Sequence, residues 1–140
     1  MIAVALIGML AAIAIPAMRH QQQRAQNARF VNDLRIFAAA FETYTTKNGH
    51  WPADAVAGVV PAGMSGELRD ADWTVASTSI GGQWDWDYKS VAFTACISVH
   101  PVTLSPEQMV EINRMIDDGN LATGNFRMTS AGYYVYILQP

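Results

Sequence analysis

The hydrophobic positions of this chain form one continuous block at its start and a periodic segment behind it. No charged side chain occurs in residues 1–18, where the run MIAVALIGMLAAIAIP is almost wholly apolar. Residues 19–29 are polar on all sides of a predicted helix. Beyond them large apolar side chains recur at spacings of three and four, which predicts an amphipathic helix. These positions are Phe30, Leu34, Phe37, Phe41 and Tyr44.

The two segments are predicted to form a single helix. Asn48-Gly49 is a natural helix stop, and Pro52 follows closely. One helix from about residue 1 to about residue 47 would be roughly 70 Å long, far beyond the length of a typical globular helix. A coiled coil is one explanation, but the stripe of apolar residues covers too few heptads. We instead expect residues 30–44 to pack on the rest of the chain while the N-terminal half projects as a stalk.

The uncharged block has the dimensions of a membrane helix. Its residues span roughly 27 Å as a helix, against roughly 30 Å of bilayer hydrocarbon. A cleavable signal peptide is a competing interpretation, but no basic segment precedes the run, which is also long for such a peptide. A buried helix of a soluble protein is disfavoured because no polar face interrupts the run. The expected membrane and assembly positions are Ile2, Leu6, Gly8, Leu10, Ala12, Ile13, Ile15 and Pro16.

Two features of this block bear on packing. Gly8 and Ala12 form a small-xxx-small pair, which would let two helices approach closely. Pro16 lacks an amide hydrogen and clashes with the preceding turn, so a kink or local melting is expected there.

The remainder, residues 51–140, is predicted to be an α+β head. We expect a short strand at 73–77, a strictly alternating strand at 83–88, and a turn at Lys89-Ser90 leading into a strand at 91–100. In that strand Val91 and Phe93 are expected to share one face with Ala95, Ile97 and Val99. Ser105 to Gln108 reads as a capping box that opens a helix ending near residue 117. A last strand is expected at 132–138.

Charge is distributed unevenly along the chain. Residues 1–50 carry five basic and two acidic side chains, and residues 51–140 carry four basic and ten acidic ones. A basic stalk beneath an acidic head could help copies of the chain stagger against each other, although simple solubility of the head is an adequate explanation. The basic residues are scattered among glutamines, so no nucleic-acid partner is predicted.

Candidate chemistry in the head is sparse. Asp85 and Asp87 project from one side of a strand, opposite Trp84 and Trp86. This surface could stack on sugar rings, but tryptophans in the core beneath a solvated acidic face are the simpler interpretation. Cys96 is alone, which excludes an internal disulfide. No nucleophile–base motif or phosphate-binding loop appears, so the chain is not predicted to be an enzyme.

The run VALIGMLAAIAIP, the long helix and the exit Tyr44-Thr-Thr-Lys-Asn-Gly49-His-Trp-Pro52 resemble the type IV pilin and type II secretion pseudopilin family. The resemblance implies a ladle-like fold, in which a long N-terminal helix packs through its C-terminal half on a small antiparallel sheet with one extra short helix. It divides the chain into a membrane or filament-core helix at 1–18, an amphipathic continuation at 19–50 and a globular head at 51–140.

The chain departs from this family at its start. Members carry a basic leader, a phenylalanine that becomes methylated and a nearby glutamate, and this sequence begins just after the aligned glutamate. A late start codon or a trimmed chain is the favoured explanation, and a chain that escapes the prepilin peptidase is the third. Processing and methylation are therefore assigned to no residue here.

The resemblance also implies a function and a location. The chain would be a structural subunit of a type II secretion pseudopilus or a type IV pilus, inserted in the bacterial inner membrane with its head in the periplasm. Its partners would be copies of itself, other pilin-like subunits and the assembly platform. The alternative is a membrane-tethered binding module that uses the Trp84/Trp86 strand surface.

No cofactor is predicted, with one weak exception. Pseudopilin relatives often hold calcium in a loop of the head, and Asp117, Asp118 and Asn120 supply clustered oxygens beside Gly119. These residues lack the spacing of an EF-hand and are also ordinary helix-ending residues, so they are only weak candidates for calcium.

Overall fold

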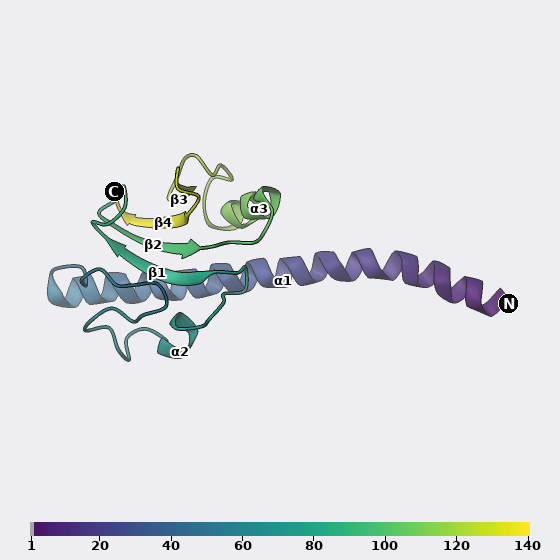
Figure 1. Cartoon of the computed structure of the whole chain (residues 1–140), viewed down its shortest axis with the longest axis horizontal. Coiled ribbons are helices and arrows are strands. Elements are labelled where there is room, and N and C mark those ends of the chain that lie inside the picture. The colour runs from purple at the N-terminus through teal and green to yellow at the C-terminus, as the bar shows by residue number, and fades with distance from the viewer. Residues whose placement is uncertain (1) are drawn as a thin grey trace.

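The computed structural model describes residues 2–140, and the side-chain surroundings of all of these except residues 2, 11–14 and 17. Its dominant element is the helix α1, Ile2–Asn48, of 47 residues. The head gathers around the C-terminal half of α1, and the N-terminal half extends away from it (Figure 1). The predicted single long helix is confirmed, and it ends where Gly49 adopts a φ of 76°.

The head contains four strands and two short helices. The helices are α2, Asp70–Trp73, and α3, Pro106–Ile116. The strands β1, Gln83–Tyr88, β2, Ala95–His100, β3, Phe126–Met128, and β4, Tyr134–Gln139, form an antiparallel sheet in the order β1-β2-β4-β3. The sheet lies on one side of α1, and the segment containing α2 lies on the other (Figure 1). The predicted α+β class is confirmed, with α2 as a helix that the sequence analysis did not expect.

The core lies between α1 and the inner face of the sheet. Strand alternation sends Trp84 and Trp86 toward α1, and the antiparallel register sets them opposite Val99 and Ile97 of β2. Leu34 and Phe37 of α1 are buried against this layer. The exclusion of these apolar surfaces from water is the main force that holds the head on the helix.

Two strand predictions are wrong. Residues 73–77 do not form a strand: Trp73 closes the helix α2, and its indole Nε1 donates a 2.9 Å hydrogen bond to the carbonyl of Val59. The helical turn carries this indole into the aromatic core, which a strand at this edge would not do. Strand β2 begins at residue 95, because the amide of Lys89 bonds to the carbonyl of Thr94 and closes residues 90–93 into a loop.

The loop changes which face two residues occupy. Val91 and Phe93 pack with Cys96, Val135 and Ile137 on the outer face of the sheet. They were expected on the inner face with Ile97. Strict alternation fails there because the segment is not extended.

Helix α3 follows its prediction closely. Ser105 has extended backbone angles, and its hydroxyl accepts a hydrogen bond from the amide of Gln108 at 3.3 Å. The helix ends at Ile116, one residue before the predicted end. In a capping box the Gln108 side chain would bond to the backbone of Ser105. Its Nε2 instead donates a hydrogen bond to Asn27 of α1.

Pro16 does not interrupt the helix. Residues on both sides of it remain helical, so the expected local melting does not occur. The helix bends gently toward its N-terminal end (Figure 1). Within the residues that the structure describes, we find no helix with both the length and the apolar character needed to cross a bilayer.

Candidate assembly helix and its junction with the head

The N-terminal half of α1 presents large apolar side chains to solvent. Val4, Leu6, Ile7, Met9 and Leu10 are each more than half exposed, at 57–72%. Ile15 and Met18 are likewise exposed, at 52% and 62%. Exposed apolar side chains gathered in this way on a protein mark a protein–protein or membrane interaction site.

The predicted assembly positions fall partly within the described surroundings. Leu6, Leu10 and Ile15 are exposed, as are Gly8 and Pro16. Nothing lies within 4 Å of a Cβ built on Gly8, so this surface is open to close approach by another helix. The side chains of Ile2, Ala12 and Ile13 lie outside the described surroundings.

Contact between α1 and the head begins at Gln26 and Asn27. The hydroxyl of Ser79 donates to the carbonyl of Gln26 at 3.2 Å. Asn27 is only 2% exposed, and its Oδ1 accepts a 2.9 Å hydrogen bond from Nε2 of Gln108 on α3. This buried amide pair fixes where the stalk leaves the head. Sequence analysis missed it because Asn27 stands in a stretch that reads as polar on every side.

On the C-terminal side of this junction, the aromatic side chains of α1 pack between tryptophans of the head. Phe30 stacks on Trp84 with ring centroids 4.9 Å apart, and Phe41 stacks on Trp86 at 3.8 Å. Phe37 meets the edge of Trp73 at 5.1 Å. Aromatic pairs in such geometries add about 0.5–1.5 kcal/mol each beyond the area that they bury.

The remaining two stripe residues also lie against the head. Leu34 is 2% exposed within the same core. Tyr44 is partly buried, and its ring lies 6.0 Å from that of His50. A Cβ added at Gly63 would lie 3.1 Å from the Tyr44 hydroxyl, which shows how closely the connector passes α1.

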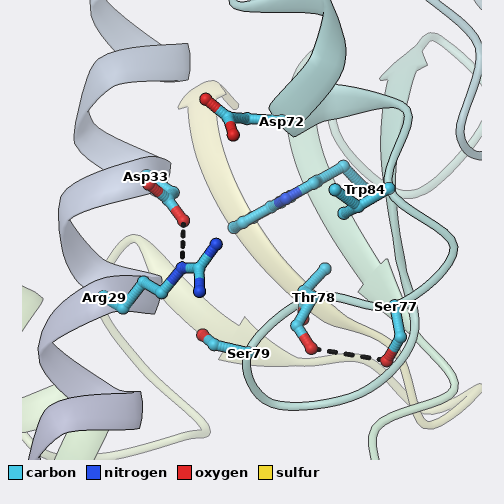
Figure 2. Close-up of a pocket in the computed structure, with 8 residues that line it drawn as sticks. Arg29, Asp33, Asp72, Ser77, Thr78, Ser79 and Trp84 are labelled. Carbon is cyan, nitrogen blue, oxygen red and sulfur yellow. Dashed lines mark hydrogen bonds and ion pairs between the residues drawn. The ribbon is translucent and has the colours of Figure 1, made fainter.

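A pocket of about 170 Å³ opens at the junction (Figure 2). Arg29 and Asp33 of α1 form one wall, with Nε and Oδ2 3.8 Å apart. Asp72 of α2, Trp84 of β1 and the loop at 77–79 form the others. Burial raises the pKa of Asp33, and Arg29 opposes this rise. Because Arg29 pairs with Asp33 and Asp72 pairs with Arg69, the pocket favours neither an anion nor a cation.

The tryptophans do not form a binding surface. Trp84 is 2% exposed and Trp86 is fully buried, so the alternative of a binding module that uses them is wrong. They are buried because α1 covers the face of β1 from which they project. The expectation of a solvated acidic face opposite them is also wrong, because Asp87 is only 8% exposed.

The weak calcium candidates make hydrogen bonds within their own loop. One oxygen of Asp117 accepts from the amides of Asn125 and Phe126. Asp118 accepts from the Thr123 hydroxyl and the Asn120 amide, and these bonds lower its pKa. Across the described residues, no set of three or more His, Cys, Asp and Glu side chains is placed to hold a metal.

Comparisons with known proteins agree with this architecture. No protein-family model matches the sequence, and no curated protein matches it. Among solved structures, the chain resembles the major type IV pilin PilA1 from Clostridium difficile, with a TM-score of 0.55 and 16% sequence identity. The match covers 84% of this chain and 97% of that chain.

The fold is therefore that of a type IV pilin: a long N-terminal helix with a small antiparallel sheet packed on its C-terminal half. This confirms the ladle-like fold that the N-terminal run and the helix exit predicted.

Proposed function

We propose that this chain is a structural, non-catalytic subunit of a pilin-like filament. The observation that carries the proposal is the set of exposed apolar side chains on the projecting half of α1: Val4, Leu6, Ile7, Met9, Leu10, Ile15 and Met18. The head does not cover the N-terminal half of α1. Another molecule must therefore cover this apolar surface. The likeness to a type IV pilin supports copies of the same chain, or related subunits, as that partner.

The physical basis of assembly would be burial of the stalk among other stalks. Fully burying a leucine or isoleucine side chain contributes about 1.5–3 kcal/mol, so a few such side chains per subunit suffice for stable packing. Gly8 leaves room for backbones to approach closely. The basic stalk and acidic head would favour a stagger that sets unlike charges opposite each other.

Membrane insertion before assembly is part of the same proposal. It rests on the absence of charge in residues 1–18 and on the family resemblance of that run. In this scheme residues 1–18 are the membrane and filament-core segment, residues 19–50 continue the helix and residues 51–140 form the periplasmic head. The inner-membrane assembly platform of a type IV pilus or a type II secretion pseudopilus would then extract the subunit.

Deletion of residues 1–17 tests the assembly role. The truncated chain should be a soluble monomer that does not enter filaments sheared from cells expressing it in place of the full chain. Two point variants give a finer test: Leu10→Glu should abolish incorporation, and Gln22→Glu, a matched exposed position that adds the same charge, should retain most of it. Normal incorporation of the truncated chain would refute the proposal.

A further inference from the structure

The outer face of the sheet holds two acidic side chains that α1 does not reach. Asp85 and Asp87 alternate along β1 with the buried tryptophans and therefore point away from the core. The antiparallel register sets Ser98 of β2 directly opposite Asp85, on the same face. Asp85, Asp87 and Ser98 are called the outer-face cluster below.

This cluster is buried, although it is polar. Ser98 is 1% exposed, Asp87 is 8% exposed, and the Asp85 side chain is 15% exposed. The neighbouring loop at 90–93 contributes to this burial, since Val91 and Phe93 pack beside the cluster on Cys96.

Three oxygen atoms of the cluster have no hydrogen-bond partner among the described residues. They are Oδ1 of Asp85, Oδ2 of Asp87 and Oγ of Ser98. The other carboxylate oxygens are engaged: Asp85 Oδ2 lies 3.4 Å from Nε2 of His100, and Asp87 Oδ1 accepts a 2.9 Å bond from the hydroxyl of Ser90. Buried polar groups are nearly always satisfied, so three open oxygens on one face require an explanation.

The charges around the cluster are unbalanced. Among the described ion pairs neither aspartate meets a lysine or arginine, and His100 is the sole basic partner, of Asp85. The Nζ of Lys89 lies over the Tyr88 ring, 5.0 Å from the centroid, and is in none of the described ion pairs.

We propose that the outer-face cluster binds a divalent metal cation, with calcium preferred, through Oδ1 of Asp85, Oδ2 of Asp87 and Oγ of Ser98. All three are hard oxygen ligands of the kind that calcium takes, and calcium tolerates irregular geometry better than magnesium does. Water would complete the coordination shell. With only two carboxylates, the expected dissociation constant is on the order of 10⁻⁴–10⁻³ M, the range of extracellular calcium modules.

A cation explains the cluster better than the two simpler alternatives. A proton on one carboxyl, together with the Ser98 hydroxyl, supplies two hydrogen-bond donors but leaves the other buried carboxylate charged. A buried water satisfies hydrogen bonds but leaves two neighbouring carboxylates with His100 as their one described basic partner, which is costly for buried charges. One divalent cation bound between these side chains would ligate all three oxygens and neutralise both charges.

The test uses the full chain in detergent. Thermal unfolding is followed in EDTA and in calcium, magnesium or sodium chloride at matched ionic strength. Calcium at about tenfold above its dissociation constant should raise Tm by about 5 °C, more than magnesium does, and sodium should not. Tb³⁺, which substitutes for calcium, should luminesce on tryptophan excitation because Trp84 and Trp86 flank Asp85.

Three variants locate the site. The double variant Asp85→Asn/Asp87→Asn should lose the calcium shift and the Tb³⁺ signal, yet unfold in EDTA no earlier than the wild type because a like-charge repulsion is gone. Ser98→Ala should weaken Tb³⁺ binding several-fold, and this decides the matter if the double variant does not fold. Asp118→Asn, in the calcium-candidate loop, should keep the calcium-induced rise in Tm and the Tb³⁺ signal of the wild type.

Two results would overturn the inference. One is a wild-type chain that calcium stabilises no more than sodium does and that gives no Tb³⁺ signal. The other is a calcium shift that survives in the double variant or disappears in Asp118→Asn. Filament incorporation does not enter the readout, so a failure of the filament proposal leaves this result standing.

Discussion

At the scale of the residue, the start of strand β1 depends on a glycine with no space beside it. Gly82 has a φ of 70°, and a Cβ at this position would lie 2.7 Å from the carbonyl carbon of His100. Backbone atoms cannot move aside as a flexible side chain can. Gly82 therefore permits both the turn into β1 and the close approach to β2.

We predict that Gly82→Ala lowers the free energy of unfolding by about 2–4 kcal/mol, from backbone strain and the clash with β2. Gly66→Ala is the matched control, because Gly66 has a similar φ of 79° with nothing within 4 Å of an added Cβ. It should lose only about 1–2 kcal/mol. Urea denaturation measures both, and equal losses would contradict the steric argument.

Asp33 carries a prediction about pH. Burial raises its pKa above the usual value of 3.8 despite the partial opposition of Arg29. The folded state therefore holds this proton more tightly than the unfolded state, so its contribution to stability falls as pH rises from 3.8 through the folded pKa.

Asp33→Asn should consequently be at least as stable as the wild type at pH 7, and this advantage should shrink as the pH is lowered toward 4. Thermal unfolding at a series of pH values measures the difference. Asp118→Asn is the contrasting control. Hydrogen bonds lower the pKa of Asp118, so its carboxylate stabilises the folded state at pH 7, and Asp118→Asn should be less stable than the wild type there. An Asp33→Asn chain that is less stable than the wild type at pH 7 would refute the assignment.

At the scale of the element, apolar packing and a buried hydrogen bond both join α1 to the head. The aromatic stripe supplies apolar burial, and the Asn27–Gln108 amide pair joins α1 to α3. The capping sequence predicted α3 itself, but not its partner. Gln108 leaves the cap because a buried amide on α1 lies within reach.

We predict that Asn27→Ala lowers the free energy of unfolding by about 1–3 kcal/mol, because it leaves the buried Nε2 of Gln108 without an acceptor. Asn32→Ala, at an exposed position on the same helix, is the control and should change stability by less than about 0.5 kcal/mol. Hydrogen exchange of α3 amides provides a local readout. If protection of α3 were unchanged in Asn27→Ala, the amide pair would not anchor that helix.

At the scale of the whole molecule, the stalk and the head are predicted to be energetically independent. The first described head contacts of α1 occur at Gln26 and Asn27, well beyond the exposed run that ends at Met18. Deletion of residues 1–17 should therefore leave the Tm of the head within about 2 °C of the full chain in detergent. A larger fall would show that the projecting helix stabilises the head.

The sequence by itself determined the long helix, the position of its end, the alternation of β1 and the cap of α3. Each is a local property: helical or strand periodicity, a glycine stop, or a side chain within reach of a nearby amide. The N-terminal run also indicated the pilin-like fold before any tertiary information.

The tertiary structure alone decided which polar groups are buried. The sequence predicted that Asp85 and Asp87 form a solvated face of β1. It does not show that the loop at 90–93 packs on the same outer face of the sheet, beside these residues. Trp73 became a helical residue because its indole fits between Phe37 and Phe41, a contact across more than thirty positions of the chain. Whether such a side chain is buried depends on which other segments of the chain pack over it, and no local sequence pattern encodes that packing.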